Sequence, residues 1–465
     1  MELVYKVNDR PPFLKMVVFA LQQLLAILAA TIAVPAIIGH GMSQSAALFG
    51  AGVGTLVYQL FTKFRSPVFL GSSFAFLGSM GAAFAGATSA QAGFTGLLLG
   101  AVFAGLVYVV IALVVKKFGV GWIDKVMPAV VIGPTVAIIG LSLAGNAIGD
   151  LAKGSVLDAN FIPVASPYVA LICGLVTLFT VIVSSVYGKK MMKMIPFIIG
   201  IVAGYIVASI FTAIGYAADK EFLKVIDFTK FKNMQWVPDF TFIEAFKGFK
   251  DIDGAFIGTV AVAYVPVAFV VFAEHIADHK NLSSIIGNDL TKDPGLGNTL
   301  LGDGVGSIAG AFFGGCPNTT YGESVGCVAI SGNASVATIT TTAILAIAAS
   351  FVAPFVTFLA TIPSCVMGGV CVTLYGFIAV SGLKMIQKVD LGDNRNLFVV
   401  SVILIAGVGG LSVAFGKVTL TTTACALILG IVANVVCSFG KKKEAQEEVV
   451  ETPVEENAPV EETQE

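Results

Sequence analysis

The sequence predicts an all-α membrane protein that crosses the bilayer many times. Of its 465 residues, 56% are hydrophobic and only 12% are charged, whereas about 25% charged residues is usual for a soluble protein. The mean hydropathy is +0.91. Apolar runs recur along almost the whole chain, and most are close to the ~20 residues that a helix needs to cross a bilayer. So few charges would not cover the surface of a soluble protein of this length.

Twelve apolar runs are long enough to be membrane spans. Two further segments are apolar but short and interrupted: 67–83, which Pro67 opens, and 317–332, which Pro317 opens. Each follows two full spans, so each is the third element in a set of seven. The sequence therefore predicts fourteen segments, arranged as seven plus seven. The twelve spans are 14–39, 45–62, 93–115, 126–147, 167–187, 194–216, 254–283, 298–314, 335–361, 364–383, 396–413 and 418–438.

The odd number of elements in each half predicts an inverted repeat, because the second half must then be inserted upside down relative to the first. Short segments broken by Gly or Pro at matching positions of two halves are the best sequence indication of a transporter's binding site. The alternative is that both segments are re-entrant loops or glycine-rich packing helices.

The positions of Lys and Arg predict the orientation. With fourteen crossings and a cytoplasmic N-terminus, 19 of the 27 basic side chains face the cytoplasm, among them Lys63 and Lys189. Six of the other eight lie in the loop 217–253, which we expect to be extracellular with some surface helix. Twelve crossings would place the clusters between the short segments on the wrong side. We therefore expect a multi-pass protein of the plasma or inner membrane with both termini in the cytoplasm.

Outside the spans, the sequence predicts little that would bind other macromolecules. Nine of the 29 acidic residues are glutamates after position 443, and the segment 441–465 has the composition of a disordered acidic tail in the cytoplasm. The basic residues form short clusters between apolar runs, which argues against nucleic-acid binding. The seven cysteines form no CxxC pair, and we expect ordinary buried thiols and no cofactor.

Carboxylates within apolar segments are candidate functional groups, because burying their charge is costly. Glu274 and Asp278 end a long apolar run; they are four residues apart and share one helical face. Glu323 lies in the second short segment, with no basic residue near it in the sequence. The alternative for residues 274–280 is the water-exposed end of a helix, where charges are simply solvated.

The same run contains two histidines with the spacing of a helical zinc site, His275 and His279. The HExxH pattern is absent, however, and His40 is the only other histidine in the sequence. We therefore predict no metal site.

Three motifs resemble the uracil permeases of the nucleobase/ascorbate transporter family. They are LGSSFAF at 70–76, FAEHIADH at 272–279 and FGGCPNTTYGESVG at 313–326. PNTTYGE is the specific part, and the similarity extends from RPP at 10–12 through VMGGV at 366–370 to the last span.

The resemblance implies a transporter body, 1–440, with two domains. A core of segments 1–4 and 8–11 covers about 14–116 and 254–361. A gate of segments 5–7 and 12–14 covers about 126–216 and 364–438. Segments 3 and 10 would each combine a short β-strand with a half-helix, and the substrate would sit between them.

The resemblance also implies which residues bind the substrate. Glu274 and Glu323 match the substrate-binding carboxylates, and the backbone amides of Phe74 and Gly322 match the groups that bind the ring carbonyls. A neutral pyrimidinedione offers two N–H donors and two carbonyl acceptors, which such groups complement. Tyr321 either packs on the ring face or is an ordinary core tyrosine.

The sequence departs from the family pattern at two places. Ser324 and Ser331 stand where the signature around segment 10 usually has Asn and Thr, which leaves the hydrogen bonds of those groups open. In segment 8, a histidine of some uracil permeases aligns with Asp278, and His279 is one position further on.

Together these features predict a secondary active transporter that imports uracil, or a close pyrimidine analogue, by proton symport. Glu323, rather than the Gln that is common in purine-type members, favours uracil over xanthine or urate. A carboxyl group near the bilayer midplane favours its neutral form, so Glu274 and Asp278 are the candidates for proton coupling. We expect the chain to bind uracil, protons and the lipid bilayer, and to form a homodimer.

Four alternatives remain open at this point. Two are carriers: a purine carrier of the same family and, more distantly, a seven-plus-seven anion transporter. An intramembrane hydrolase is a third, although it lacks a nucleophile motif such as GxSxG. A sensor whose acidic tail recruits partners is the fourth.

Overall fold

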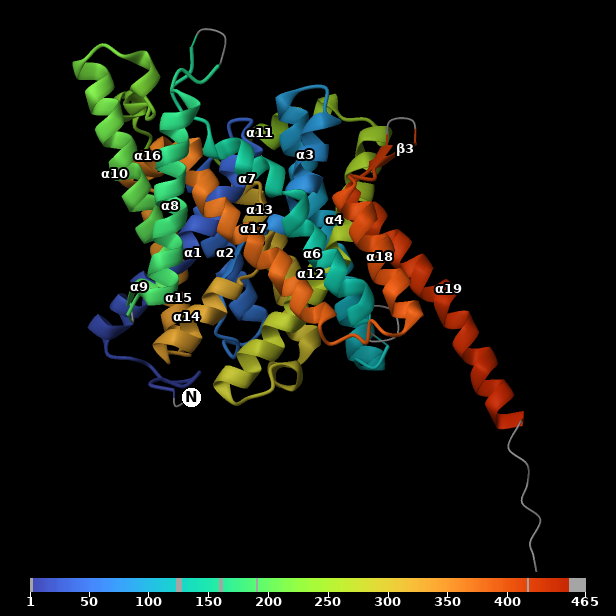
Figure 1. Ribbon diagram of the computed structural model, residues 1–465. Coiled ribbons are helices and arrows are strands. Elements are labelled where there is room, and N and C mark those ends of the chain that lie inside the picture. Colours follow the sequence, from blue (N-terminus) through green and yellow to red (C-terminus); the bar gives the residue numbers. More distant parts are fainter. Residues whose placement is uncertain (1–2, 123–127, 159–161, 190, 416–417, 451–465) are drawn as a thin grey trace, which may run out of the picture.

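The computed structural model describes residues 3–122, 128–158, 162–189, 191–415 and 418–450. Most of the regular structure is helical, and the long helices form one bundle (Figure 1). The first half of the chain contains α1 Phe13–Ile38, α2 Gln44–Phe61, β1 Leu70–Ser72, η1 Phe74–Phe76, α3 Leu77–Ala85, α4 Ala90–Phe118, α6 Ala129–Ser142, α7 Ala144–Leu151, α8 Pro167–Tyr187, α9 Met191–Met194 and α10 Pro196–Ala217.

A connection of short helices joins this half to the next. It contains η2 Glu221–Leu223, η3 Phe228–Asn233, α11 Thr241–Gly248 and η4 Phe249–Asp251. The second half contains α12 Gly254–Ile286, η5 Thr291–Gly295, α13 Leu296–Gly314, β2 Asn318–Thr320, α14 Gly322–Ser331, α15 Val336–Ala349, α16 Ala353–Thr361, α17 Ser364–Ile386, α18 Asn394–Val408, β3 Val413–Phe415, β4 Val418–Leu420 and α19 Thr422–Val450.

The prediction of a helical protein with several membrane spans is confirmed. Within the described ranges, seven helical segments are long and apolar enough to cross a membrane: α1, α4, α6 together with α7, α8, α10, α12 and α17. An eighth is added if α15 and α16 form one span. Their outward side chains are apolar, so the bundle can face lipid on its outer surface.

The chain departs from the predicted boundaries in its second half. Residues 335–361, predicted as one span, form α15 and α16, which are bent by 84°. Pro354 lies in the first turn of α16. Because it has no N–H to donate to a carbonyl of the preceding turn, a single straight helix cannot continue through it.

The last helix also differs from its predicted limits. α19 continues to Val450, so residues 441–450, expected at the start of a disordered tail, are helical. Residues 451–465 of that tail lie outside the described residues, as do Lys125, Lys190 and Lys417, which contribute to the predicted orientation.

The two halves repeat one packing pattern. α1 packs on α15 as α12 packs on α4, and α8 packs on α10 as α18 packs on α19. The equivalent helices α2 and α13 pack against each other, and so do α6 and α17. The equivalent strands β1 and β2 pair antiparallel, with Leu70 opposite Thr320 and Ser72 opposite Asn318. Antiparallel pairing of equivalent strands is what an inverted relation between two halves produces.

The central contact between the halves depends on small residues. α2 and α13 approach so closely that a Cβ atom on Gly50 would lie 2.3 Å from the carbonyl oxygen of Gly310. Small residues allow such close approach of helices in a membrane. The strand pair lies beside this contact, so the α2–α13 packing also fixes where β1 and β2 meet.

We expect Gly50→Ala to destabilise the protein by about 1–3 kcal/mol, because the added methyl group must push the two backbones apart. Thermal unfolding of the purified protein in detergent measures this. Gly376→Ala is the matched control: it also lies within a helix, but no atom lies within 4 Å of its added Cβ position. Equal unfolding temperatures for the two variants would contradict the tight α2–α13 contact.

Candidate functional site

The short segments of both halves meet at the centre of the molecule. Proline opens each one, at Pro67 and Pro317, and each then forms a three-residue strand followed by a short helix. The hydroxyl of Tyr321 donates to the carbonyl oxygen of Ser72 at 2.7 Å. The ring of Tyr321 lies over Gly71, where a Cβ would be 2.3 Å from a ring carbon. Glycine is therefore required there, and Tyr321 joins the two segments.

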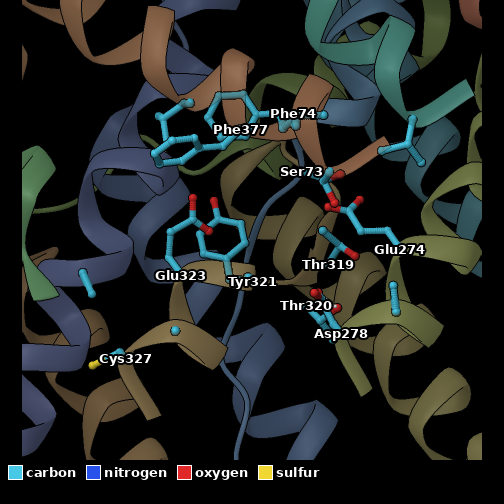
Figure 2. A pocket seen from close by; sticks show the side chains of 18 of the residues that line it. Ser73, Phe74, Glu274, Asp278, Thr319, Thr320, Tyr321, Glu323, Cys327 and Phe377 are labelled. Carbon is cyan, nitrogen blue, oxygen red and sulfur yellow. Dashed lines mark hydrogen bonds between the residues drawn. The ribbon is translucent and has the colours of Figure 1, made fainter. Parts of the chain in front are cut away.

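A cavity of about 380 Å³ lies beside this strand pair (Figure 2). Its volume falls within the range of small-molecule sites. It is lined from one side by Ser73 and by residues of α1, η1, α12, β2 and α14, and from the other by residues of α6, α8, α9, α10 and α17. The structure brings together on its wall all six residues that the sequence predicts for substrate binding or proton coupling, namely Phe74, Glu274, Asp278, Tyr321, Gly322 and Glu323.

The three carboxylates approach the cavity from two helices. Glu274 and Asp278 lie one turn apart on α12, and Glu323 is in the first turn of α14. The N-terminal end of a helix favours a negative charge. Thr320 on β2 donates its hydroxyl hydrogen bond to Oδ2 of Asp278 at 2.7 Å. In Figure 2 the carboxylate of Glu274 points toward Ser73.

Hydrogen-bond donors accompany these acceptors. Phe74 is the first residue of η1 and Gly322 the first residue of α14. Backbone N–H groups in the first turn of a helix have no partner within that helix. The cavity wall thus combines carboxylate acceptors with backbone donors, and it can hold a small planar molecule that has both donors and acceptors.

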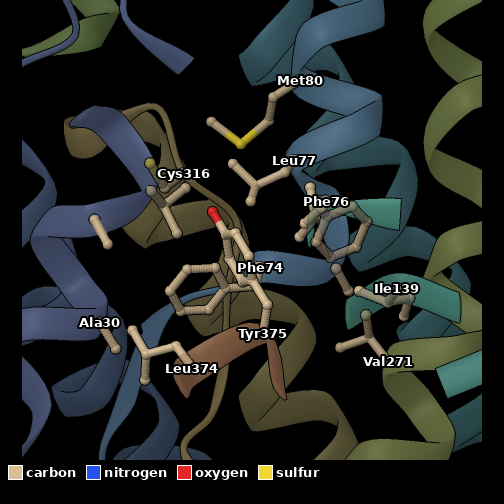
Figure 3. Close-up of a cluster of buried hydrophobic side chains, with 14 of the residues drawn as sticks. Ala30, Phe74, Phe76, Leu77, Met80, Ile139, Val271, Cys316, Leu374 and Tyr375 are labelled. Carbon is tan, nitrogen blue, oxygen red and sulfur yellow. The ribbon is translucent and has the colours of Figure 1, made fainter. Parts of the chain in front are cut away.

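A buried apolar cluster bounds the cavity next to Phe74 (Figure 3). The rings of Phe74 and Tyr375, on α17, pack edge to face with centroids 5.8 Å apart. At the opposite end, the cavity is lined by exposed residues, among them Lys193 and Ile330. The cavity is therefore reached from the end of the molecule at which α9 and the N-terminus lie (Figure 1).

Asp278 is not at the end of its helix. α12 continues eight residues beyond it, to Ile286, and Asp278 is only partly exposed. Its carboxylate lies against β2 through Thr320. The interpretation of residues 274–280 as a solvated helix end therefore does not describe this carboxylate.

The two histidines are directed away from the cavity into the protein. His275 is hydrogen-bonded through Nδ1 to Oδ2 of Asp303 at 2.7 Å and through Nε2 to Oγ1 of Thr299 at 3.0 Å. His279 is hydrogen-bonded through Nε2 to the hydroxyl of Tyr58 at 2.7 Å. Among the described residues, no three His, Cys, Asp or Glu side chains are grouped to hold a metal ion.

Both serines that replace family residues have partners. Ser324 Oγ accepts a hydrogen bond from the backbone N–H of Phe69 at 3.0 Å and also contacts the side-chain amide of Gln23. Ser331 Oγ accepts from the N–H of Asn333 at 3.2 Å. The smaller side chains thus still connect α14 to α1, to the start of β1 and to the turn that follows α14.

Sequence reasoning missed three polar residues near the site. Asp303 is 1% exposed within α13, and the criterion that selects Glu274, a carboxylate in an apolar run, would also have selected it. Thr320 and Ser73 carry no such signal, because hydroxyl side chains are common in membrane helices. Ser73 lines the cavity, and its hydroxyl has no hydrogen-bond partner in the described part of the chain.

Comparison with known proteins identifies the family and agrees with the fold. Residues 14–415 match the sequence model of the permease family designated Xan_ur_permease. The uracil permease of Bacillus caldolyticus is 37% identical over 93% of this chain and 94% of its own length. That of Bacillus subtilis (strain 168) is 36% identical over 94% and 96%.

Among solved structures, the transmembrane domain of a cyanobacterium bicarbonate transporter, BicA, superimposes with a TM-score of 0.60. The match covers 92% of this chain and all of that domain at 16% identity, so it shows the shared fold alone. The chain belongs to the permease family that its sequence matches. This confirms the predicted resemblance, and it makes the protein a permease rather than an intramembrane hydrolase.

Proposed function

We propose that the protein imports uracil, or a close pyrimidine analogue, by proton symport. The observation that carries the proposal is the cavity in which Glu274 and Glu323 converge with the first backbone amides of η1 and α14. The carboxylates would accept the two ring N–H groups, and the amides of Phe74 and Gly322 would donate to the ring carbonyls. Tyr321 would pack beside the ring. The family relatives named uracil permeases support this choice of substrate.

Equilibrium binding to the purified protein tests the choice of substrate. We expect uracil to bind and to be displaced poorly by xanthine or urate, because Glu323 offers only acceptors to the substrate edge. Stronger binding of xanthine than of uracil would instead support the purine carrier.

The transport cycle in this proposal needs two bodies that move relative to one another. The core would comprise α1–α4 with α12–α16, and the gate α6–α10 with α17–α19, in fourteen crossings. This division is supported by the cavity, which has residues of both sets on its wall, and by the helix contacts within each set, which match between the two halves of the chain. Substrate would then be exposed to each side of the membrane in turn, as in other inverted-repeat transporters.

Proton coupling is assigned to Glu274 and Asp278. A charged carboxylate is costly within the membrane, so these groups favour carrying a proton when the cavity is closed to water. Binding a proton together with the substrate would let the loaded carrier reorient without a bare buried charge. The partial exposure of both residues to the cavity supports this role, since a proton can reach them from the open side.

The orientation in this proposal places α9 and both termini in the cytoplasm of the producing cell. Single cysteines at Lys189 and Trp236 test it, because both positions are exposed, and six of the seven native cysteines are buried. On intact cells, a membrane-impermeant maleimide should label position 236 and leave position 189 unlabelled until the cells are permeabilised. Labelling of position 189 on intact cells would contradict fourteen crossings. The homodimer remains a prediction.

A further inference from the structure

The N-terminal segment, residues 3–9, lies at the far end of the helix that begins with the proposed substrate-binding residues. The N–H groups of Val4 and Tyr5 both donate to the carbonyl oxygen of Gly332, at 2.8 and 3.2 Å. Gly332 ends α14 with a φ of 67°, and the last carbonyl groups of a helix have no partner within it. The segment supplies donors to one of these groups, the carbonyl of Gly332.

The same segment continues along the start of α15. The N–H of Ala334 donates to the carbonyl oxygen of Tyr5 at 2.9 Å, and that of Val336 to the carbonyl oxygen of Val7 at 3.0 Å. Ser335 Oγ donates to the carbonyl oxygen of Asp9 at 2.6 Å. Residues 3–9 therefore join the end of α14 to the beginning of α15 as an added strand would.

One face of the segment is apolar and packs inward. Leu3 and Val7 contact a buried cluster that includes Val325 and Val328 of α14 and also Leu282 of α12. By contrast, Val4 points outward and is 63% exposed. The contacts thus link residues 3–9 to both helices that carry the carboxylates of the cavity.

We propose that residues 3–9 position α14, and through it Glu323 and the amide of Gly322, for substrate binding. α14 has ten residues and spans ~15 Å, so it moves as a short rigid rod. Only Tyr321 separates its first residue from β2, whereas Gly332, directly after its last turn, is hydrogen-bonded to residues 3–9. Ser324 holds the first turn to Phe69 and Gln23, so loss of the attachment at the other end lets the rod tilt and displaces the carboxylate. The identity of the substrate, uracil, rests on the proposed function. The attachment of residues 3–9 to α14 does not depend on it.

The same substitution on the two faces of the segment tests the proposal. Val7→Asp places a charge in the cluster with Val325 and Val328, whereas Val4→Asp places it in solvent. We expect Val7→Asp to weaken equilibrium uracil binding by about tenfold, as expected for a misplaced hydrogen-bonding group. Val4→Asp should bind uracil like the wild type. Val7→Ile, which keeps an apolar side chain at the same position, should also retain wild-type affinity.

Hydrogen exchange of residues 324–331 supplies a readout that does not depend on uracil. We expect faster exchange there in Val7→Asp and in the milder Ser335→Ala, with α4 unchanged in both. Ser335→Ala keeps the test available if Val7→Asp does not fold. Folded variants with wild-type uracil affinity and wild-type exchange in α14 would overturn the proposal, as would a lower unfolding temperature with unchanged affinity. Absence of uracil binding by the wild type would refute the proposed function instead, and the exchange result would still decide whether the attachment holds α14.

Discussion

Glu323→Gln should weaken uracil binding by about tenfold to a hundredfold, equivalent to roughly 1–3 kcal/mol. Gln has nearly the shape of Glu, but its amide group also donates, and a donor would then face a substrate N–H. Glu323 lies in the first turn of α14, on the cavity wall. Isothermal titration of the purified variant measures the loss.

Two further variants make this result specific. Glu221→Gln changes an exposed carboxylate in the connection between the halves, and it should leave binding unchanged. Glu274→Gln should weaken binding to a similar degree and should also slow transport, because Glu274 takes part in coupling in our proposal. Uracil affinity equal to that of the wild type in Glu323→Gln would remove Glu323 from the binding site.

Asp278→Asn should separate binding from coupling. Asn can still accept the hydrogen bond that Thr320 donates to Asp278, so the local structure should survive. It can no longer take up or release a proton, however. We expect uracil binding within about tenfold of the wild type, or ~1.4 kcal/mol, while accumulation driven by an acid gradient is lost.

Exchange of internal for external uracil should be measured in the same variant. It needs no net proton movement, so Asp278→Asn should retain it. Gradient-driven accumulation at the wild-type rate in Asp278→Asn would show that the proton is carried elsewhere, with Glu274 as the next candidate. If both exchange and accumulation were lost, the substitution would block reorientation of the carrier rather than proton coupling.

The sequence predicted the helices well, because a membrane span is a local pattern. α1 and α8 begin and end within one residue of their predicted limits. The bend between α15 and α16 was missed, although Pro354 marks it, because the run 335–361 contains no charged residue and is hydrophobic enough on average for a single span. Hydropathy records which residues tolerate lipid, and it does not record where the backbone turns.

The site was predicted in part from local patterns and in part from the resemblance. Paired carboxylates at Glu274 and Asp278 are visible within one helix. The pairing of Leu70 with Thr320 joins segments 250 residues apart, and periodicity contains no information about such contacts. The hydrogen bond between Thr320 and Asp278, and the attachment of residues 3–9 to α14, likewise depend on tertiary structure.

Uptake of radiolabelled uracil into proteoliposomes is the most direct test of proton-coupled uracil transport. With the outside more acidic than the lumen, we predict accumulation of uracil above its external concentration, and only equilibration when the gradient is abolished by a protonophore. Liposomes without protein and liposomes with Glu323→Gln serve as controls. Equal uptake with and without the gradient would contradict proton coupling, and no uptake above that of empty liposomes would contradict uracil transport itself.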